Sequence, residues 1–169
     1  MTRNRSDQKK SASDADAERQ IVTTNRRARH DYEILDQLDC GMVLTGSEVK
    51  SVRNSKIQIE EAWVRVDYGE VWLIGCDIAE YAQASIYNHD RRRKRKLLLK
   101  RREIRKFAES ADKNGLTLIP LQVFFQRGIA KLRIGLCRGR KVHDKRERLR
   151  ENADRREMRT ARMKQTGRK

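Results

Sequence analysis

The segment AWVRVDYGEVWLIGCDI, residues 62–78, contains two alternating apolar runs on either side of Tyr68-Gly69. In residues 62–67 every second residue is apolar, and residues 71–78 alternate in the same way. Successive side chains of a strand point to opposite faces, so each run predicts a β-strand. A two-residue turn that contains glycine typically joins antiparallel neighbours. The segment therefore predicts a β-hairpin.

Further strands and helices are predicted on both sides of this hairpin. Alternation in residues 32–44 suggests a strand with a bulge or bend at Gly41, and residues 116–126 change phase across Pro120, as at a kink or an edge. Residues 45–56 predict a short helix, and a second helix runs from about Leu98 to a stop at Asn114-Gly115. The last strand is predicted at residues 129–137, with alternate apolar residues on one face.

About six short strands with two to three flanking helices indicate a mainly β protein. Closing an antiparallel sheet on itself removes its edges, so we expect a small closed barrel of the OB type. The expected domains are a disordered extension at 1–24, the barrel at 25–138 and a basic tail at 139–169. We expect the stretch before the second helix, from Asn88 to about Leu97, to be a charged loop.

The composition indicates a polyanion as the partner. The 169 residues contain 41 Lys plus Arg and 24 Asp plus Glu, a formal net charge of +17. A protein of this charge suits nucleic acid, whereas a membrane-surface protein would have bulky apolar residues opposite its basic face. No window approaches a membrane span, and the first residues lack the apolar core of a secretion signal. We therefore expect a cytoplasmic protein that does not contact a membrane.

The chain shows no pattern typical of catalysis, a metal site or a cofactor. The three cysteines, Cys40, Cys76 and Cys137, are widely spaced in apolar runs and are predicted to be reduced thiols of the core. The three histidines lie in different segments without metal-ligand spacing. No phosphate-binding glycine loop or nucleophile motif occurs. We predict no enzyme, no metal and no cofactor, and take Asp39 and Glu48 as isolated carboxylates near turns.

Three basic clusters, at residues 25–30, 91–106 and 139–169, suggest several contacts with phosphates. The last cluster has 13 Lys or Arg and 5 Asp or Glu and no apolar stripe, so we expect it to become helical only when bound. Aromatic residues make up only 5%, which favours folded RNA over a single strand that stacks on aromatic platforms. From spacing alone, Asp144 is either a helix-start residue or an orienting group for its cationic neighbours.

Four motifs, in order and spacing, resemble the SsrA-binding protein (SmpB) family. They are NRRARHDYEI (25–34), GMVLTGSEVKSVR (41–53), RKLLLKRREI (95–104) and IGLCRGRKVHDKR (134–146), followed by a basic tail. The resemblance extends from about residue 23 to the end. It implies an OB-type barrel, a monomer, that binds the tRNA-like domain of transfer-messenger RNA (tmRNA). It also implies delivery of that RNA to stalled bacterial ribosomes for trans-translation, in which the ribosome is rescued and the stalled peptide tagged.

The resemblance also implies two groups of site residues. The implied tmRNA-binding positions of the barrel are Asn25, Arg27, Arg29, His30, Asp39, Cys40, Gly41, Arg95, Lys96 and Leu97. The positions implied to lie at the empty decoding centre and in the mRNA channel are Gly139, Lys141, His143, Asp144, Lys145 and Arg146. In this role the tail replaces a missing anticodon arm and codon, which favours the orienting role for Asp144.

Two other functions remain open at this point. A structural protein of the ribosome would also have a basic tail, and it would stay on the particle in stoichiometric amount at high salt. An RNA-processing enzyme would turn over RNA and would depend on a residue such as His30.

Overall fold

The predicted hairpin is present, as strands β4 (Trp63–Asp67) and β5 (Glu70–Ile74). The computed structural model describes residues 19–140 and Met158, apart from the side chains of residues 85–87 and 112–114. The turn residues Tyr68 and Gly69 have φ angles of 47° and 76°, and the pairing Asp67↔Glu70 closes the hairpin. Positive φ at both central residues matches the turn to the twist of the two strands.

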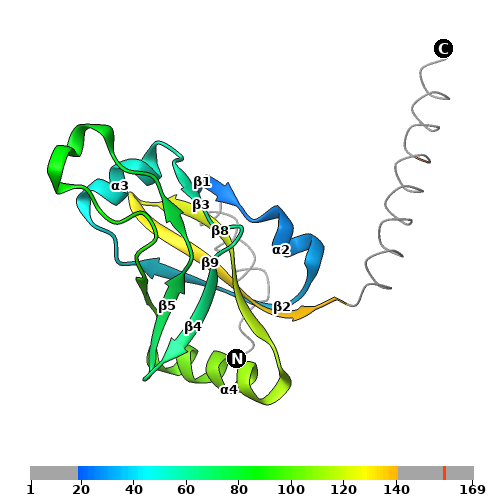
Figure 1. Cartoon of the computed structure of the whole chain (residues 1–169). Coiled ribbons are helices and arrows are strands. Elements are labelled where there is room, and N and C mark those ends of the chain that lie inside the picture. The colour runs from blue at the N-terminus through cyan, green and yellow to red at the C-terminus, as the bar shows by residue number, and fades with distance from the viewer. Residues whose placement is uncertain (1–18, 141–157, 159–169) are drawn as a thin grey trace, which may run out of the picture.

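The remaining elements alternate short strands with helices along the chain (Figure 1). Their bounds are β1 Arg19–Thr24, α2 Arg26–Asp31, β2 Tyr32–Met42, α3 Gly46–Arg53, β3 Ile57–Gln58, β6 Asp77–Ile78, the 3₁₀ helix η1 Ala82–Tyr87, β7 Arg95–Leu98, α4 Arg101–Asn114, β8 Thr117–Gln126 and β9 Ile129–Gly139.

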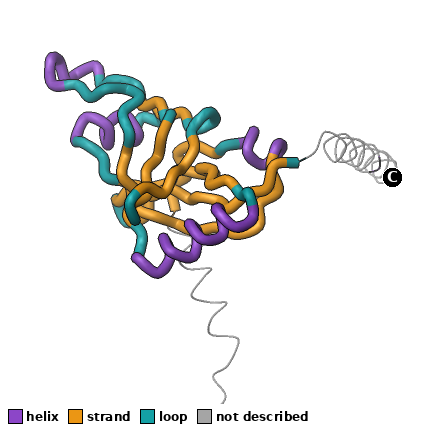
Figure 2. The backbone as a smooth tube through the Cα atoms, turned by 60° about the horizontal axis from the view of Figure 1, so that its bottom comes forward, coloured by secondary structure: helices purple, strands orange, loops and turns teal. Residues whose placement is uncertain are grey.

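Six of the strands close into a ring. The order of the seven-stranded sheet is β1-β8-β4-β5-β7-β2-β9, and an additional pairing of β8 with β9 closes it, so that β1 is the one strand of this sheet outside the ring. Strands β3 and β6 form a separate two-stranded sheet. All of these pairings are antiparallel. The helices lie around the outside of the strands, as Figure 2 shows. The prediction of a mainly β, closed antiparallel barrel of the OB type is confirmed.

The barrel interior is apolar, and a smaller cluster attaches helix α2 to it. The main core takes alternate residues of the ring strands, such as Val64, Leu73 and Leu132. The second cluster consists of Ala28, Ile119, Leu121 and Cys137. Burial of this cluster fixes one face of α2 against β8 and β9. The opposite face of α2 is left to solvent.

Several predicted details of the strands and helices are confirmed. The β8–β9 register shifts between Pro120 and Gln122, which is the kink expected at Pro120. Helix α4 ends at Gly115, whose φ of 59° is left-handed. The three cysteines are buried and free, and burial raises the pKa of Cys40 to about 12. Within the described residues, no helix is long and apolar enough to cross a membrane.

Three predictions about local structure are wrong. Residues 19–24, assigned to the disordered extension, form β1, because their backbone pairs with Gln122–Gln126 of β8. Residues 95–97, assigned to a charged loop, and Leu98, assigned to the start of the second helix, form β7, which pairs with both β5 and β2. Helix α4 begins only at Arg101. The bulge expected at Gly41 lies instead between Ile34 and Asp36. A Cβ on Gly41 would lie 3.4 Å from Leu98 Cβ, an ordinary van der Waals contact, so Gly41 packs beside β7 without strain.

Candidate nucleic-acid interface

Asn25 holds helix α2 in place from inside the protein. Its side-chain oxygen accepts a hydrogen bond from Ala28 N (2.8 Å), and its amide donates to Ile59 O and Pro120 O (both 3.1 Å). The residue has no exposed surface. Asn25 therefore caps α2, a common role for asparagine at the start of a helix. Its amide also joins the helix to two other segments of the chain.

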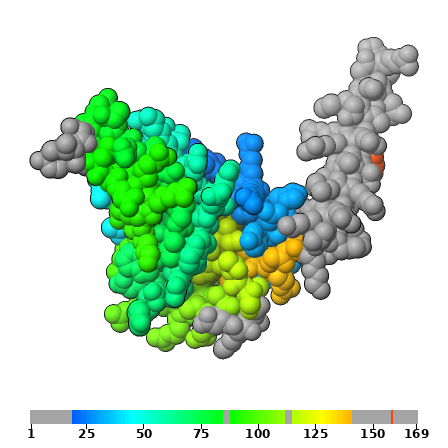
Figure 3. Space-filling model, viewed as in Figure 1, coloured from blue at the N-terminus to red at the C-terminus, as the bar shows by residue number. Residues whose placement is uncertain are grey.

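The exposed face of α2 is basic. Because Ala28 points inward, Arg26, Arg27, Arg29 and His30 are left exposed. Residues of α2 lie beside the end of β9 on the molecular surface (Figure 3), and Arg140 N donates to Asp31 O (3.1 Å). Arginines exposed on one face of a helix can contact RNA phosphates without reading sequence.

The start of the tail lies at this same end of the barrel. Gly139 pairs with Tyr32, the residue that follows α2. The structure therefore brings Gly139 together with Asn25, Arg27, Arg29 and His30. The other predicted residues of the decoding-centre group, Lys141, His143, Asp144, Lys145 and Arg146, lie outside the described residues.

The second predicted group lies near the far end of β2. Gly41 pairs with Leu98 and Met42 with Leu97, so Asp39–Gly41 and Arg95–Leu97 are neighbours in the barrel wall. The eleven residues of β2 correspond to roughly 35 Å of strand at about 3.3 Å per residue. The predicted barrel residues thus form two groups near opposite ends of one strand, which suits one extended, folded RNA better than a short single strand.

Asp39 is not an isolated carboxylate. Arg133 donates to it from Nε (2.6 Å) and Nη2 (3.0 Å), and Arg19 lies 3.3 Å away. Both guanidinium groups lie over the ring of Phe124, at 5.1 and 5.7 Å from its centroid. Asp39 therefore orients two arginines that were not among the predicted site residues. The signal for Arg133 was its position on the polar face of the last strand.

Glu48 is not isolated either. Its side chain is fully buried and accepts hydrogen bonds from Arg93 Nε (2.8 Å), Arg95 Nε (2.9 Å) and Thr45 N (2.8 Å). Burial raises the pKa of this carboxyl, but the hydrogen bonds from Arg93 and Thr45 and the charges of Arg95 and Arg93 outweigh it, so the pKa is lowered. Charge-assisted hydrogen bonds of this kind favour the ionised form.

This buried pair shapes the basic loop that precedes β7. Arg95 is also fully buried, and it donates to the carbonyl oxygens of Cys76 (2.7 Å), Arg93 (3.0 Å) and Arg91 (2.9 Å). Within the same loop Arg92 and Lys94 are exposed. The loop therefore exposes cations to solvent, while the buried Arg95 fixes the loop backbone through its hydrogen bonds to Arg91 O and Arg93 O.

Four of the ten predicted tmRNA-facing side chains are turned away from solvent. Asn25 and Arg95 have no exposed surface, and Cys40 and Leu97 are 3% and 2% exposed. The prediction that these side chains face RNA is therefore corrected, because their polar atoms are used inside the protein or they pack in the core. Arg27, Arg29, His30, Asp39, Gly41 and Lys96 keep exposed or half-buried positions.

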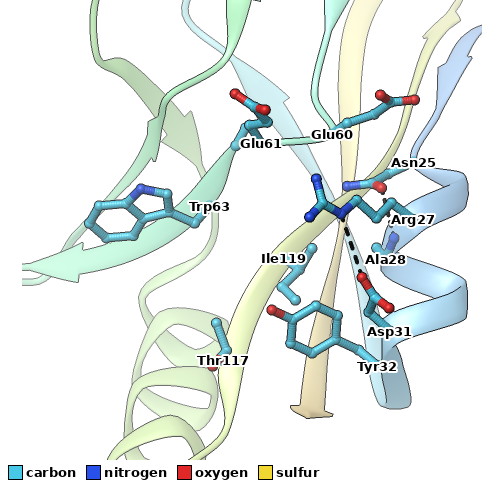
Figure 4. A pocket seen from close by; sticks show the side chains of 11 residues that line it. Asn25, Arg27, Ala28, Asp31, Tyr32, Glu60, Glu61, Trp63, Thr117 and Ile119 are labelled. Atoms are coloured by element: carbon cyan, nitrogen blue, oxygen red, sulfur yellow. Dashed lines mark hydrogen bonds and ion pairs between the residues drawn. The ribbon is translucent and has the colours of Figure 1, made fainter. Parts of the chain in front are cut away.

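A cleft opens beside α2. It has a volume of about 430 Å³ and lies between this helix and the start of β4. Figure 4 shows Trp63 on the side away from α2, Glu60 and Glu61 along the rim, and Tyr32 and Arg27 on the helix side. The sequence pattern does not reveal this cleft, because its walls come from three segments, at residues 25–32, 60–63 and 117–119, that are distant in the chain.

Comparison with known proteins agrees with these features. A family model described as "SmpB protein" matches residues 22–165. An SsrA-binding protein of Rhodopirellula baltica is 56% identical over 127 residues, which is 75% of this chain and 72% of that protein. The SsrA-binding protein of Streptomyces avermitilis is 49% identical over 142 residues, covering 84% and 80% of the two chains.

A solved structure is similar as well. It is described as "tmRNA-SmpB: a journey to the center of the bacterial ribosome", and its matching chain is 46% identical with a TM-score of 0.61. The similarity covers 71% of this chain and 85% of that one.

The closed barrel, with an exposed basic helix near one end of β2 and a basic loop near the other, defines a nucleic-acid-binding protein of the OB class. Within that class, the family model and the identities to curated relatives settle the family. The chain belongs to the SmpB family of SsrA-binding proteins.

Proposed function

We propose that this protein binds the tRNA-like domain of tmRNA and delivers it to stalled ribosomes for trans-translation. The observation that carries the proposal is the basic face of α2, held by the buried Asn25, in a chain of the SmpB family. The exposed cations of the loop at residues 91–94, near the opposite end of β2, extend the same surface. Contacts with phosphates and 2′-hydroxyls are the usual way to recognise folded RNA.

Six residues of the barrel are proposed to face the RNA. Arg27, Arg29 and His30 bind near one end of β2, and Lys96 binds near the other. Asp39 contributes by orienting Arg133 and Arg19, and Gly41 lies beside β7, where it pairs with Leu98. Asn25, Cys40, Arg95 and Leu97 support this surface from inside.

The tail is proposed to act on the ribosome rather than on tmRNA. In this proposal Gly139, Lys141, His143, Asp144, Lys145 and Arg146 lie at the empty decoding centre and in the mRNA channel. Support comes from the +17 net charge, from the family match that extends to residue 165, and from the position of Gly139 at the surface where the barrel ends. The proposal includes no catalytic step, and because its partners are a ribosome and its RNA, it places the protein in the cytoplasm.

The test of tmRNA binding uses paired charge variants. Arg27→Ala with Arg29→Ala should weaken binding to the tRNA-like domain. The slope of log K against log salt should become shallower by about 1.4–1.8, since each of the two lost phosphate contacts removes roughly 0.7–0.9. The matched control, Arg53→Ala with Lys56→Ala, removes the same charge from exposed positions on and after α3. It should change affinity and slope much less.

The measurement is fluorescence anisotropy of labelled RNA at four or more salt concentrations. Equal effects of the two double variants would mean that only net charge matters, and the assignment of α2 would then be wrong. Failure of the unaltered protein to bind tmRNA would end the proposal itself.

A further inference from the structure

The cleft beside α2 has walls of unusual composition for a protein of this charge. One wall carries Trp63, whose large apolar side chain is 42% exposed. The chain has two tryptophans in all. Ile119, which is 6% exposed, lines the cleft together with the half-buried Tyr32. The exposed indole of Trp63 at the edge of this cleft provides a surface on which a planar ring can stack.

The rim carries two carboxylates without cationic partners. Glu60 and Glu61 are exposed, and neither makes an ion pair or a side-chain hydrogen bond within residues 19–140. The described part of the chain has many arginines and lysines, and other carboxylates such as Asp39, Glu48 and Asp77 are paired with them. Unneutralised carboxylates beside a phosphate-binding helix would weaken RNA binding unless they accept hydrogen bonds from the RNA.

Only one common base offers a carboxylate two adjacent donors. The Watson–Crick edge of guanine presents N1–H and N2–H₂ side by side, whereas adenine and cytosine place a ring acceptor next to their amino group. Uracil presents one N–H between two carbonyl acceptors. Bases of unpaired RNA nucleotides are read in this way, by stacking and by hydrogen bonds to this edge. The phosphates of the same nucleotide and its neighbour would face the cations of α2.

We propose that this cleft binds one unpaired guanine base of the RNA partner, stacked on Trp63 with its Watson–Crick edge toward Glu60 and Glu61. Arg27, which is 68% exposed and lies 3.5 Å from Asp31, closes the helix side. The inference rests on the proposed function and names the base that the barrel reads. A cationic side chain of a protein would also suit carboxylates and an indole, but the exposed Arg26 and Arg29 of α2 disfavour it.

The first experiment follows Trp63 alone. In Trp72→Phe, Trp63 is the only tryptophan. Titration with full-length tmRNA should quench its emission and saturate at one RNA per protein, at the same concentrations at which a gel shift saturates. A saturated gel shift without any change in Trp63 emission would overturn the guanine site while leaving tmRNA binding intact. No shift with the unaltered protein would instead overturn the proposed function.

The second experiment identifies the base. Kethoxal modifies unpaired guanines at N1 and N2, so one guanine of tmRNA should lose reactivity in the saturated wild-type complex. It should stay reactive with Trp63→Ala and with Glu60→Gln plus Glu61→Gln. The second variant alters only exposed side chains and is expected to fold. A control, Ile129→Ala, changes an exposed residue outside the cleft and should protect that guanine fully.

The same protection pattern with all variants would contradict the inference. We expect the glutamine variant to bind tmRNA about 5- to 100-fold more weakly, the range for losing a bidentate contact to a base.

Discussion

Asn25 lies in a basic motif, yet its side chain never reaches the surface. Its three hydrogen bonds connect the first turn of α2 to the carbonyl oxygens of Ile59 and Pro120, which belong to segments 34 and 95 residues away. Leaving buried carbonyl groups such as these without partners costs about 1–3 kcal/mol each. In the proposed function, Asn25 would affect RNA binding indirectly, because it fixes the position of the helix that carries Arg27 and Arg29.

Glu48 shows how one carboxylate can determine the shape of a basic loop. It accepts hydrogen bonds from Arg93 and Arg95, and both Glu48 and Arg95 are completely buried. Two charges can be buried together only when their hydrogen bonds are satisfied, and removal of one partner leaves the other uncompensated.

We predict that Glu48→Gln lowers the free energy of unfolding at pH 7 by about 3–5 kcal/mol, because the charge of Arg95 is then buried without its partner. The pKa of Glu48 is lowered in the folded state, so its contribution is complete above the ordinary glutamate pKa of about 4.3 and disappears as the pH falls through the folded-state value. The difference in unfolding free energy between the two proteins should therefore be largest near neutral pH and should begin to narrow below about pH 4.

Urea denaturation between pH 3 and pH 8 measures this gap. Glu33→Gln removes an exposed carboxylate from β2 and serves as the control, with an expected change within about 0.5 kcal/mol. A gap that stays constant down to pH 3 would show that the charge of Glu48 has no part in stability.

At the scale of elements, the outgoing arm of the hairpin changes direction at a single glycine. Val71 and Leu73 are buried in β5, but Cys76 and Ile78 are buried after it, so the inward phase shifts by one residue. Gly75 lies at the shift, with φ of 74°. Its backbone packs against the segment that carries Glu61, since a Cβ on Gly75 would lie 3.2 Å from Glu61 O.

We predict that Gly75→Ala destabilises the protein by about 1–3 kcal/mol, because alanine disfavours left-handed φ and its methyl group crowds Glu61 O. Gly46→Ala is the matched control, since it begins α3 with no atom within 4 Å of the added Cβ. It should be neutral or slightly stabilising. Thermal unfolding of the two variants makes the comparison, and equal melting temperatures would refute the conformational role of Gly75.

At the scale of the whole molecule, the end of β9 marks where the barrel stops. The strand continues to Gly139, and Arg140 N still bonds to Asp31 O. A truncation after Cys137 would remove part of β9, whereas one after Arg140 leaves every described strand complete. The second truncation therefore separates the tail from the fold.

We predict that the chain truncated after Arg140 binds the tRNA-like domain with nearly unchanged affinity but fails to support tagging of stalled peptides. The reason is that α2, Asp39 and the loop at residues 91–94 are all retained, while every position proposed for the decoding centre except Gly139 is lost. Replacing Asp144, Lys145 and Arg146 by alanine in the full chain should have the same effect on tagging.

Binding assays and a tagging assay with purified ribosomes measure the two functions separately. Parallel loss of both in the truncated chain would contradict the division between barrel and tail. Normal tagging by the triple variant would remove the role assigned to Asp144 and its neighbours.

Much of this architecture could be predicted from local sequence. Strict alternation in residues 62–67 and 129–137, the turn at Tyr68-Gly69 and the stop at Gly115 all depend on neighbouring residues, and the structure contains each of them. The basic clusters and the family motifs likewise depend on composition and order. Period and turn chemistry are properties of a few adjacent residues, so one chain is enough to reveal them.

The strand assignments that failed depend on distant partners. Residues 19–24 have no strong pattern of their own and become β1 because the edge of β8 offers hydrogen bonds. Residues 95–98 begin with Arg95, whose charge is costly to bury without a partner. Glu48, which lies 47 residues earlier in the chain, supplies the carboxylate that pairs with it. No local rule could supply either partner.

The chain's local pattern is enough to predict the barrel, its basic surfaces and the family, because periodicity, charge and motif order are properties of neighbouring residues. Which of those residues face outward depends on the folded barrel. It placed Asn25 and Arg95 inside, joined Asp39 to Arg133, and brought Trp63 opposite α2 to form a cleft. The physical reason is that burial and hydrogen-bond satisfaction depend on groups distant in the chain, which meet only when the barrel closes.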